Sequence, residues 1–480
     1  MAVKILFVSA EVSNFASSGG LAEVAGSLPK AIQGANRNYK VKVIMPLYKK
    51  IKDTYQDKLK YIGCDNVTLA WRNLYMGLFT YKYNGIDYYF IDNEYYFNRD
   101  KIYGEYDDGE RFAFFSKAIF KAFTLMDYYP NIIHSNDWHS ALVNIYLDIL
   151  YKKEGVYTDI KSVFTIHNIE YQGVFSLNFL TDVIGIDQKY TEILEYNGLI
   201  NLMKGAIVCS DMVTTVSPRY SREITTSTYA YGLENIIRLN KNKLYGIING
   251  IDVDSYNPLT DKFINTNYDV NSIEKKVLNK LALQKELNLD VSEDIPMIAI
   301  ISRLVSHKGI NLILDACQGF IDLGAEIVVL GTGVYEFEER FKDIARRNPN
   351  RVKAMIEYNN GLSRKIYSSS DLFLMPSKSE PCGLSQMIAS RYGAVPIVRA
   401  TGGLFDTIQE YEWITHIGNG FVFRDYNASS LYEKTKSALE LYYNDRPNFN
   451  MLVKNAMMMD FSWNNSAKIY IEAYKKLLKK

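Results

Sequence analysis

The chain has 480 residues, which is too long for one compact core, so two or three domains are expected. Its formal net charge is +1, so the sequence does not support a general electrostatic attraction to nucleic acid or to an anionic membrane. Hydrophobic residues make up 48% and charged residues 23%, as in an ordinary soluble globular protein. Any binding site for an anion must therefore be local.

The cysteines and the apolar segments indicate a cytoplasmic protein. The four cysteines lie far apart and lack the spacing of metal ligands, which favours reduced thiols. No secretion signal is expected before the strand-like residues 4–9, and no apolar stretch reaches the length needed to span a bilayer. The 38 tyrosines fit half-buried strands, although some of them could stack on sugar rings.

The first half of the chain mostly alternates strand-like and helix-like segments. Strands are predicted at residues 4–9, 40–46, 132–135, 162–167, 212–217 and 243–249. Helices are predicted from Leu21, over 111–126, from the Asp137 cap, over 199–209 and from Pro218. Asn84-Gly85 lies between two aromatic runs in 74–92 and predicts an antiparallel hairpin.

The second half alternates more regularly. Residues 252–295 are polar with little apolar rhythm and are interpreted as a crossover. Strands then follow at 297–302, 326–330, 352–358, 372–375 and 395–398, with helices from Gly309, Tyr335, Ser363, Ser385 and Leu404. Such alternation predicts a parallel sheet with helices on both faces. Ligands of such folds bind at the carboxyl ends of the strands, so a cleft between two such edges is the expected active site.

Residues 379–386 (SEPCGLSQ) carry the first candidate site. They follow a buried strand and precede a helix, which places the Glu380 carboxylate beside free backbone N–H groups. Free N–H groups at a helix start attract phosphate, and a carboxylate accepts hydrogen bonds from sugar hydroxyls. The alternative is an ordinary loop with a capping serine and a solvated glutamate.

Basic residues and glycine turns favour a binding site for a diphosphate. Arg303 and Lys308 flank the start of a helix, where two cations suit a diphosphate, although they could be two exposed basic residues on a turn. Gly19-Gly20 and Gly402-Gly403 each follow a strand-like run and precede a helix-like one. The G-x-G-x-x-G fingerprint of a dinucleotide site is absent from the first turn.

Metal and hydrolase sites are weaker hypotheses. His134, His139 and His167 lie at element ends, but their spacing does not match that of metal ligands. Asp137 and Glu380 would suggest a carboxylate pair for glycoside hydrolysis. A hydrolase has no use for a diphosphate cradle, so the phosphate-type loops argue against this alternative.

Several motifs together resemble one known family, the bacterial glycogen synthases and plant starch synthases. In order they are KILFVSAEV from Lys4, GGLAEVAGSLP from Gly19, DDGERFAFFSKA from Asp107, DWHSAL from Asp137, FTIHNIEYQG from Phe164, VTTVSPRYSREI from Val213, NGIDVDSYNP from Asn249, SRLVSHKG from Ser302, EPCGLSQMIASRYGAVPIVRATGGLFDTI from Glu380 and DFSWNNSAKIYIEAYKKLL from Asp460.

The resemblance implies the α/β fold called GT-B, with two Rossmann-like parallel-sheet domains facing across a deep cleft. The expected acceptor domain is 1–246 joined by the C-terminal helix 460–480, and the expected donor domain is 247–459. The implied reaction transfers glucose from ADP-glucose to the non-reducing end of an α-1,4-glucan such as glycogen. Configuration is retained, and neither a cofactor nor a metal is expected.

The resemblance also implies the roles of single residues. Arg303 and Lys308 would stabilise the leaving diphosphate. Glu380 would hold the glucose hydroxyls, and His167 would contact the glucose near the reacting carbon, beside Asp137. The other implied donor-binding residues are Ser18, Gly19, Gly20, Asn249, Tyr358 (packed on the adenine), Cys382, Gly383, Leu384, Thr401, Gly402 and Gly403.

Three positions depart from the family's pattern. Ser17 stands where a lysine usually precedes the first glycine turn, and a lost charge-assisted contact costs roughly 1.5–3 kcal/mol. Glu357 replaces a glycine before Tyr358, and Val334 replaces an aspartate. The alternatives are therefore a related transferase that prefers UDP-glucose or another acceptor, and a catalytically impaired glucan-binding protein.

Overall fold

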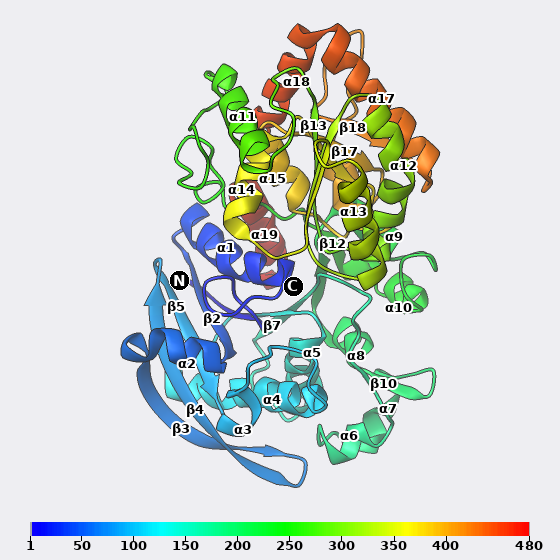
Figure 1. Ribbon diagram of the computed structural model, residues 1–480. Coiled ribbons are helices and arrows are strands. Elements are labelled where there is room, and N and C mark those ends of the chain that lie inside the picture. Colours follow the sequence, from blue (N-terminus) through cyan, green and yellow to red (C-terminus); the bar gives the residue numbers. More distant parts are fainter. Residues whose placement is uncertain (1, 480) are drawn as a thin grey trace. The chain divides into compact units, whose positions relative to one another are not determined.

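The computed structural model describes residues 2–479, so Met1 and Lys480, at the ends of the expected first domain, lie outside it (Figure 1). The chain forms two compact units. Unit 1 runs to Gly250 and resumes at Trp463, and unit 2 is Ile251–Ser462. The sequence analysis placed the two domain boundaries at 246/247 and 459/460. Across the described chain, none of the helices is long and apolar enough to cross a membrane.

Unit 1 is built on a nine-stranded sheet with the order β12-β11-β7-β6-β1-β2-β5-β4-β3. The six predicted strands pair in parallel, and β5 continues the parallel set beside β2. The strands are β1 Val3–Val8, β2 Tyr39–Pro46, β3 Lys60–Leu69, β4 Arg72–Tyr83, β5 Ile86–Asp92, β6 Ile132–Asn136, β7 Lys161–Ile166, β11 Met212–Thr215 and β12 Leu244–Gly246.

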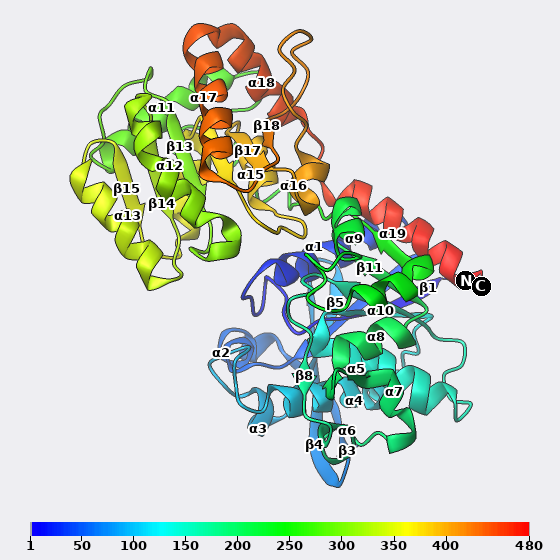
Figure 2. The same cartoon turned by 90° about the vertical axis from the view of Figure 1, so that its right-hand side faces the viewer.

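Helices and a small second sheet complete unit 1. The helices are α1 Gly20–Ala35, α2 Lys49–Tyr55, α3 Glu94–Phe97, α4 Asp108–Met126, α5 Trp138–Tyr146, α6 Phe179–Asp182, α7 Thr191–Leu194, α8 Leu202–Cys209, α9 Pro218–Glu223, α10 Glu234–Leu239 and α19 Trp463–Leu478. The small sheet holds β8 Val174–Phe175, β9 Glu195–Tyr196 and β10 Leu199–Asn201. Helix α19 packs on α1 and brings the last turns of the chain back to unit 1 (Figure 2).

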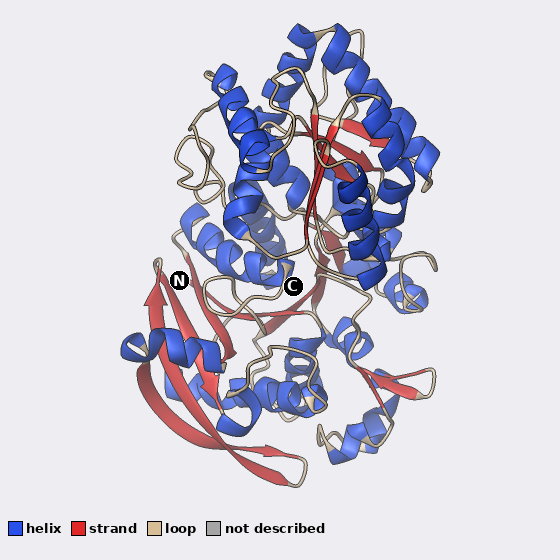
Figure 3. Cartoon of the chain, in the orientation of Figure 1, coloured by secondary structure: helices blue, strands red, loops and turns tan. Residues whose placement is uncertain are grey.

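Unit 2 is a six-stranded parallel sheet with the order β15-β14-β13-β16-β17-β18 and helices on both faces (Figure 3). Its strands are β13 Met297–Ile301, β14 Glu326–Leu330, β15 Val352–Met355, β16 Leu372–Met375, β17 Val395–Arg399 and β18 Phe421–Phe423. Its helices are α11 Lys276–Glu286, α12 Ile310–Asp322, α13 Tyr335–Arg347, α14 Asn360–Ser369, α15 Ser385–Arg391, α16 Gly402–Thr407, α17 Ala428–Asn444 and α18 Arg446–Met458. The predicted parallel α/β sheet is confirmed.

Three local predictions were wrong. The polar crossover contains α11, which was missed because the helix buries Lys276, Asn279, Lys280 and Gln284 in place of an apolar stripe. The predicted helix at 199–209 begins as β10, because Asn201 caps α8 by accepting a hydrogen bond from the Lys204 N–H at 2.9 Å. Strand β15 ends at Met355, three residues before the predicted end at Tyr358. The predicted hairpin is confirmed as β4 and β5, and β3 pairs beside it as a further strand.

Candidate functional site

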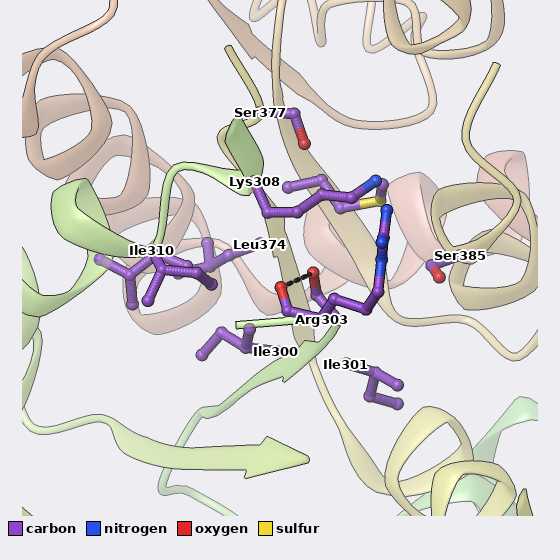
Figure 4. A pocket seen from close by; sticks show the side chains of 11 residues that line it. Ile300, Ile301, Arg303, Lys308, Ile310, Leu374, Ser377 and Ser385 are labelled. Carbon is purple, nitrogen blue, oxygen red and sulfur yellow. Dashed lines mark hydrogen bonds between the residues drawn. The ribbon is translucent and has the colours of Figure 1, made fainter. Parts of the chain in front are cut away.

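A cavity of about 180 Å³ lies in unit 2 at the carboxyl end of β13. The strand order reverses direction between β13 and β16, and open α/β sheets bind their ligands at this switch point. Arg303 and Lys308 line the cavity beside apolar residues such as Ile310 and Leu374 (Figure 4). The two cations predicted to bind a diphosphate therefore share one pocket.

The Lys308 ammonium is paired with a carboxylate of the protein. Its Nζ donates to Glu380 Oε2 at 2.6 Å, and the Ser377 hydroxyl donates to the same oxygen at 3.1 Å. The Glu380 residue is only 6% exposed, so the alternative of a solvated glutamate is wrong. A buried carboxylate needs such partners, because an unpaired charge would lose its hydration without compensation.

The glycine turn after β17 packs directly against the Glu380 loop. A Cβ atom on Gly402 would collide with the Glu380 carbonyl, and one on Gly403 would collide with the Cys382 carbonyl. The Gly403 N–H donates to the carbonyls of Glu380 and Pro381 at 3.1 and 3.2 Å. This N–H is therefore used inside the protein, where it holds the glycine turn against the Glu380 loop.

The start of α15 keeps donors available. In the part of the chain that is described, the N–H groups of Gly383 and Leu384 donate to no protein acceptor. Gly383 has a φ of +74°, a conformation that favours glycine, and the Gln386 amide donates to its carbonyl at 3.0 Å. Cys382 is buried beside them. These two donors follow Glu380 in the same loop, and their contact with a ligand stays a prediction.

Arg399 and Tyr426 hold the loops of this site together and were missed from the sequence. Arg399 donates to the Ser377 carbonyl at 2.8 Å and to the Lys378 carbonyl. The Tyr426 hydroxyl lies 3.1 Å from the Ser306 carbonyl, and the Arg399 guanidinium lies 5.7 Å from the Tyr426 ring. The turn that carries Lys308 and the loop that carries Glu380 are thus anchored to the ends of β17 and β18.

In unit 1, Asp137 links the ends of two parallel strands. It occupies the N-cap position of α5, as predicted, with a φ of +54°, but its side chain makes no capping hydrogen bond to that helix. Its Oδ1 accepts hydrogen bonds from the N–H groups of His167 at 2.8 Å and Asn168 at 3.4 Å. Burial raises the pKa of Asp137 from 3.8 to about 7.

His167 is held in one tautomer by Asn136, a residue that the sequence analysis did not single out. The Asn136 Nδ2 donates to the Val8 carbonyl at 2.8 Å, so its Oδ1 is the acceptor for His167 Nε2 at 2.9 Å. His167 Nδ1 is then left as an acceptor. Burial lowers the pKa of His167 to about 3, so the ring is neutral at physiological pH.

The first glycine loop rests on a buried glutamate. The Ser18 N–H and hydroxyl donate to Glu11 Oε2 at 2.5 and 2.9 Å. Glu11 is 3% exposed, and burial raises its pKa. A Cβ on Gly19 or Gly20 would meet nothing within 4 Å, so contacts inside the protein do not require glycine there. Ser17 is exposed at the start of this loop.

Comparisons with known proteins cover the whole chain. Residues 4–239 match the family described as starch synthase catalytic domain, and residues 284–456 match the glycosyl transferases group 1. The glycogen synthases of Clostridium beijerinckii and Geobacillus thermodenitrificans are 45% and 42% identical over 478 and 480 residues, or 99% and 100% of this chain and 99% and 98% of theirs.

This chain belongs to the glycogen and starch synthase family. The predicted resemblance is confirmed, and the protein is a glycosyltransferase that acts on a glucan. A solved structure agrees: the catalytic domain of starch synthase IV from Arabidopsis thaliana, bound to ADP and acarbose, is 32% identical with a TM-score of 0.91 and full coverage of both chains. The fold of unit 1 and unit 2 is that of the GT-B transferases.

The family's other expected donor contacts lie in two different environments. Asn249 is 5% exposed near the end of unit 1, and its Oδ1 has no hydrogen-bond partner in the described structure. Tyr358 is 93% exposed in the loop after β15. Thr401 is buried and occupies the N-cap position of α16. An orphaned buried oxygen and an exposed ring are both positions where a ligand would add contacts.

The three candidate histidines do not form a metal site in the described structure. His134 lies between the Tyr474 hydroxyl at 2.7 Å and the Thr165 hydroxyl at 2.5 Å, and His139 stacks on Tyr103 with ring centroids 4.3 Å apart. Within residues 2–479, no three His, Cys, Asp or Glu side chains group as metal ligands. The first two histidines are thus explained by packing, and His167 remains the candidate for substrate contact.

Proposed function

We propose that the chain transfers glucose from ADP-glucose to the non-reducing end of an α-1,4-glucan such as glycogen, with retention of configuration, as a cytoplasmic enzyme. The observation that carries the proposal is the Lys308–Glu380 pair beside Arg303 at the switch point of unit 2. The similarity of the chain to a glycogen synthase over 99% of its residues supports a glucan as the acceptor. The Arabidopsis thaliana starch synthase IV structure, which is bound to ADP, supports the donor.

The pair gives a physical account of donor binding. The Lys308 charge is compensated by Glu380 at 2.6 Å. A bound diphosphate would offer Lys308 and Arg303 a stronger anionic partner and leave the Glu380 carboxylate to accept hydrogen bonds from glucose hydroxyls. The N–H groups of Gly383 and Leu384 would add neutral donors. In the proposal the two cations act in place of a metal ion, and no cofactor takes part.

The chemical step would need charge stabilisation at the leaving diphosphate. As the bond between glucose and the diphosphate breaks, negative charge grows on the diphosphate oxygens, and the cations Arg303 and Lys308 would stabilise it. In the proposal, unit 1 contributes the neutral His167 and the hydrogen-bonded Asp137 to the glucose. The His167 tautomer would leave Nδ1 as an acceptor for a sugar hydroxyl.

A donor competition tests the proposal. Purified protein is mixed with glycogen and either ADP-glucose or UDP-glucose, and nucleotide release and chain elongation are measured. Elongation with ADP-glucose as the better donor is expected, with the new linkage in the α configuration. Preference for UDP-glucose would assign the chain to a related transferase, and binding of glycogen without turnover would indicate an impaired enzyme.

A further inference from the structure

Unit 2 carries an exposed apolar patch outside the candidate site. Part of it lies on the loop of residues 408–420, which joins α16 to β18, and part lies on one face of α18. The exposed fractions of its side chains run from 46% for Met451 to 87% for Ile414. We call it the loop–α18 patch, and its five members are Trp413, Ile414, Ile417, Met451 and Met458.

The loop and the helix form one continuous surface. The Asn455 side chain on α18 donates to the His416 carbonyl of the loop at 3.2 Å, and Figure 2 shows the loop beside this helix. Met451 lies four residues before Asn455, and Met458 lies three residues after it. Residues three and four apart share one face of a helix, so both methionines lie on the face that meets the loop.

The exposed end of the loop has a fixed conformation. The Tyr411 hydroxyl lies 2.7 Å from His416 Nδ1, and the Trp413 ring packs edge to face on the Tyr411 ring with centroids 5.4 Å apart. The Glu412 N–H donates to the Ile417 carbonyl at 2.9 Å, and the His416 N–H donates to the Glu412 carbonyl at 2.8 Å. Because the backbone is already ordered, binding of a partner would cost little loop entropy.

The patch and the candidate pocket lie at opposite ends of the sheet. The loop enters β18 at its amino end, and a Cβ on Gly420 would meet the Pro396 carbonyl near the start of β17. Arg303 and Lys308 line the pocket at the carboxyl end of β13. The strands of unit 2 are parallel, so a partner on the patch would leave the pocket open.

The chemistry and size of the patch fit a protein partner. Isoleucine and methionine side chains offer no strong hydrogen bonds to sugar hydroxyls, so a glucan would stack on Trp413 alone. If a large side chain presents roughly 200 Å² when free, the five together expose about 600 Å², at the upper end for a monomer. Two copies that cover each other's patch would bury about 1,200 Å², which is enough for a specific dimer.

The charges beside the patch fit the pairing of identical copies. In a two-fold interface each patch faces itself, and uncharged side chains such as these avoid a contact between like charges. Glu412 is exposed on the loop, and Lys454 is exposed on α18, three residues after Met451 and four before Met458. When the loop of one copy faces α18 of the other, Glu412 of each copy lies near Lys454 of the other copy.

We propose that the loop–α18 patch is the interface of a two-fold symmetric homodimer. Ile414 and Trp413 form its apolar centre, and the Glu412–Lys454 pairs at its rim set the orientation of the two copies. This surface is separate from the candidate site, so the inference does not depend on the proposed function.

Sedimentation velocity of the full chain over a range of concentrations tests the proposal. We expect a dimer that dissociates on dilution. Ile414→Asp should raise the dissociation constant about 30-fold or more, as for a central side chain of an interface. The matched control is Leu239→Asp, which changes an exposed leucine in unit 1 and should leave the constant unchanged.

The rim pairs give a second and more specific test. Glu412→Lys places two lysines together and should raise the dissociation constant about tenfold, and adding Lys454→Glu should restore it to within about threefold of the parent. Circular dichroism checks that each variant keeps its fold.

A chain that is monomeric at every concentration, a dimer that Ile414→Asp leaves intact, or a double variant without recovery would each refute the proposal. If a monomeric chain binds maltoheptaose and Trp413→Ala abolishes that binding, a glucan covers the patch instead, and the dimer is refuted.

Discussion

The Lys308–Glu380 pair can be tested by removing each charge separately, because the two substitutions should act on ADP with opposite signs. Lys308→Ala removes a cation from the diphosphate and should weaken ADP binding by about 10- to 100-fold, as expected for a charge-assisted hydrogen bond. Glu380→Gln removes an anion 2.6 Å from that cation and frees Lys308, so ADP should bind at least as tightly as before.

Stability and turnover should respond differently in these variants. The side chains of Lys308 and Glu380 are 19% and 7% exposed, so Lys308→Ala leaves a largely desolvated carboxylate with only the Ser377 hydroxyl. Breaking such a pair costs roughly 3–5 kcal/mol, and we expect about 3 because the lysine still reaches solvent. Loss of stabilisation at the leaving group should lower kcat by about 10²- to 10³-fold.

The assays are denaturant unfolding, calorimetry with ADP, and release of ADP from ADP-glucose in the presence of glycogen. Lys280→Ala is the matched control, because Lys280 forms a buried pair with Asp371 at 2.9 Å at the amino end of β16. It should destabilise the protein and leave ADP affinity unchanged. If Lys308→Ala and Glu380→Gln weaken ADP binding equally, the pair acts as a structural unit and its proposed exchange of partners is refuted.

Three further substitutions have defined outcomes. Tyr426→Phe removes the hydroxyl beside Ser306 but keeps the ring near Arg399. The kcat should fall about threefold to tenfold, while the free energy of unfolding changes by about 1 kcal/mol at most. Unchanged turnover would contradict the positioning role of Tyr426. Asp137 has a pKa of about 7 in the folded protein instead of 3.8, so the free energy of unfolding should fall as pH rises from about 4 to 7. Relative to the parent, Asp137→Asn should gain up to roughly 4 kcal/mol in free energy of unfolding over that range. A difference between the two proteins that does not change with pH would argue against the raised pKa. Ser17→Lys should tighten ADP-glucose binding about tenfold, measured by calorimetry, and weaker or equal binding would show that other residues already compensate.

Local periodicity accounts for most of the fold. Central parallel strands such as β14 are buried on two faces, so they read as short apolar runs, and helices such as α12 have one apolar stripe. The failures occurred where this relation breaks down. Helix α11 buries Lys276 and Lys280, whose partners are the Ser368 and Ser370 carbonyls and Asp371, and no local pattern announces such partners.

In the candidate site too, local motifs located some residues and missed others. Motifs located Arg303, Lys308 and Glu380, because each lies where a strand ends and the carboxyl ends of parallel strands share one edge. Motifs do not reveal whether an N–H already donates to a carbonyl, as the Gly403 N–H does to Glu380 and Pro381. They also missed Asn136 and Glu11, which act through other residues and leave no distinct spacing.

The family, the two α/β units and the loops that carry charge could be predicted from the sequence, because these depend on residue type and on periods of a few residues. The pairing of those charges depends on tertiary contacts. Lys308 and Glu380 are 72 residues apart in the chain, and their contact exists because β13 and β16 are neighbours in the sheet. Hydrogen-bond partners, burial and the resulting pKa shifts follow from such long-range contacts, which no local pattern contains.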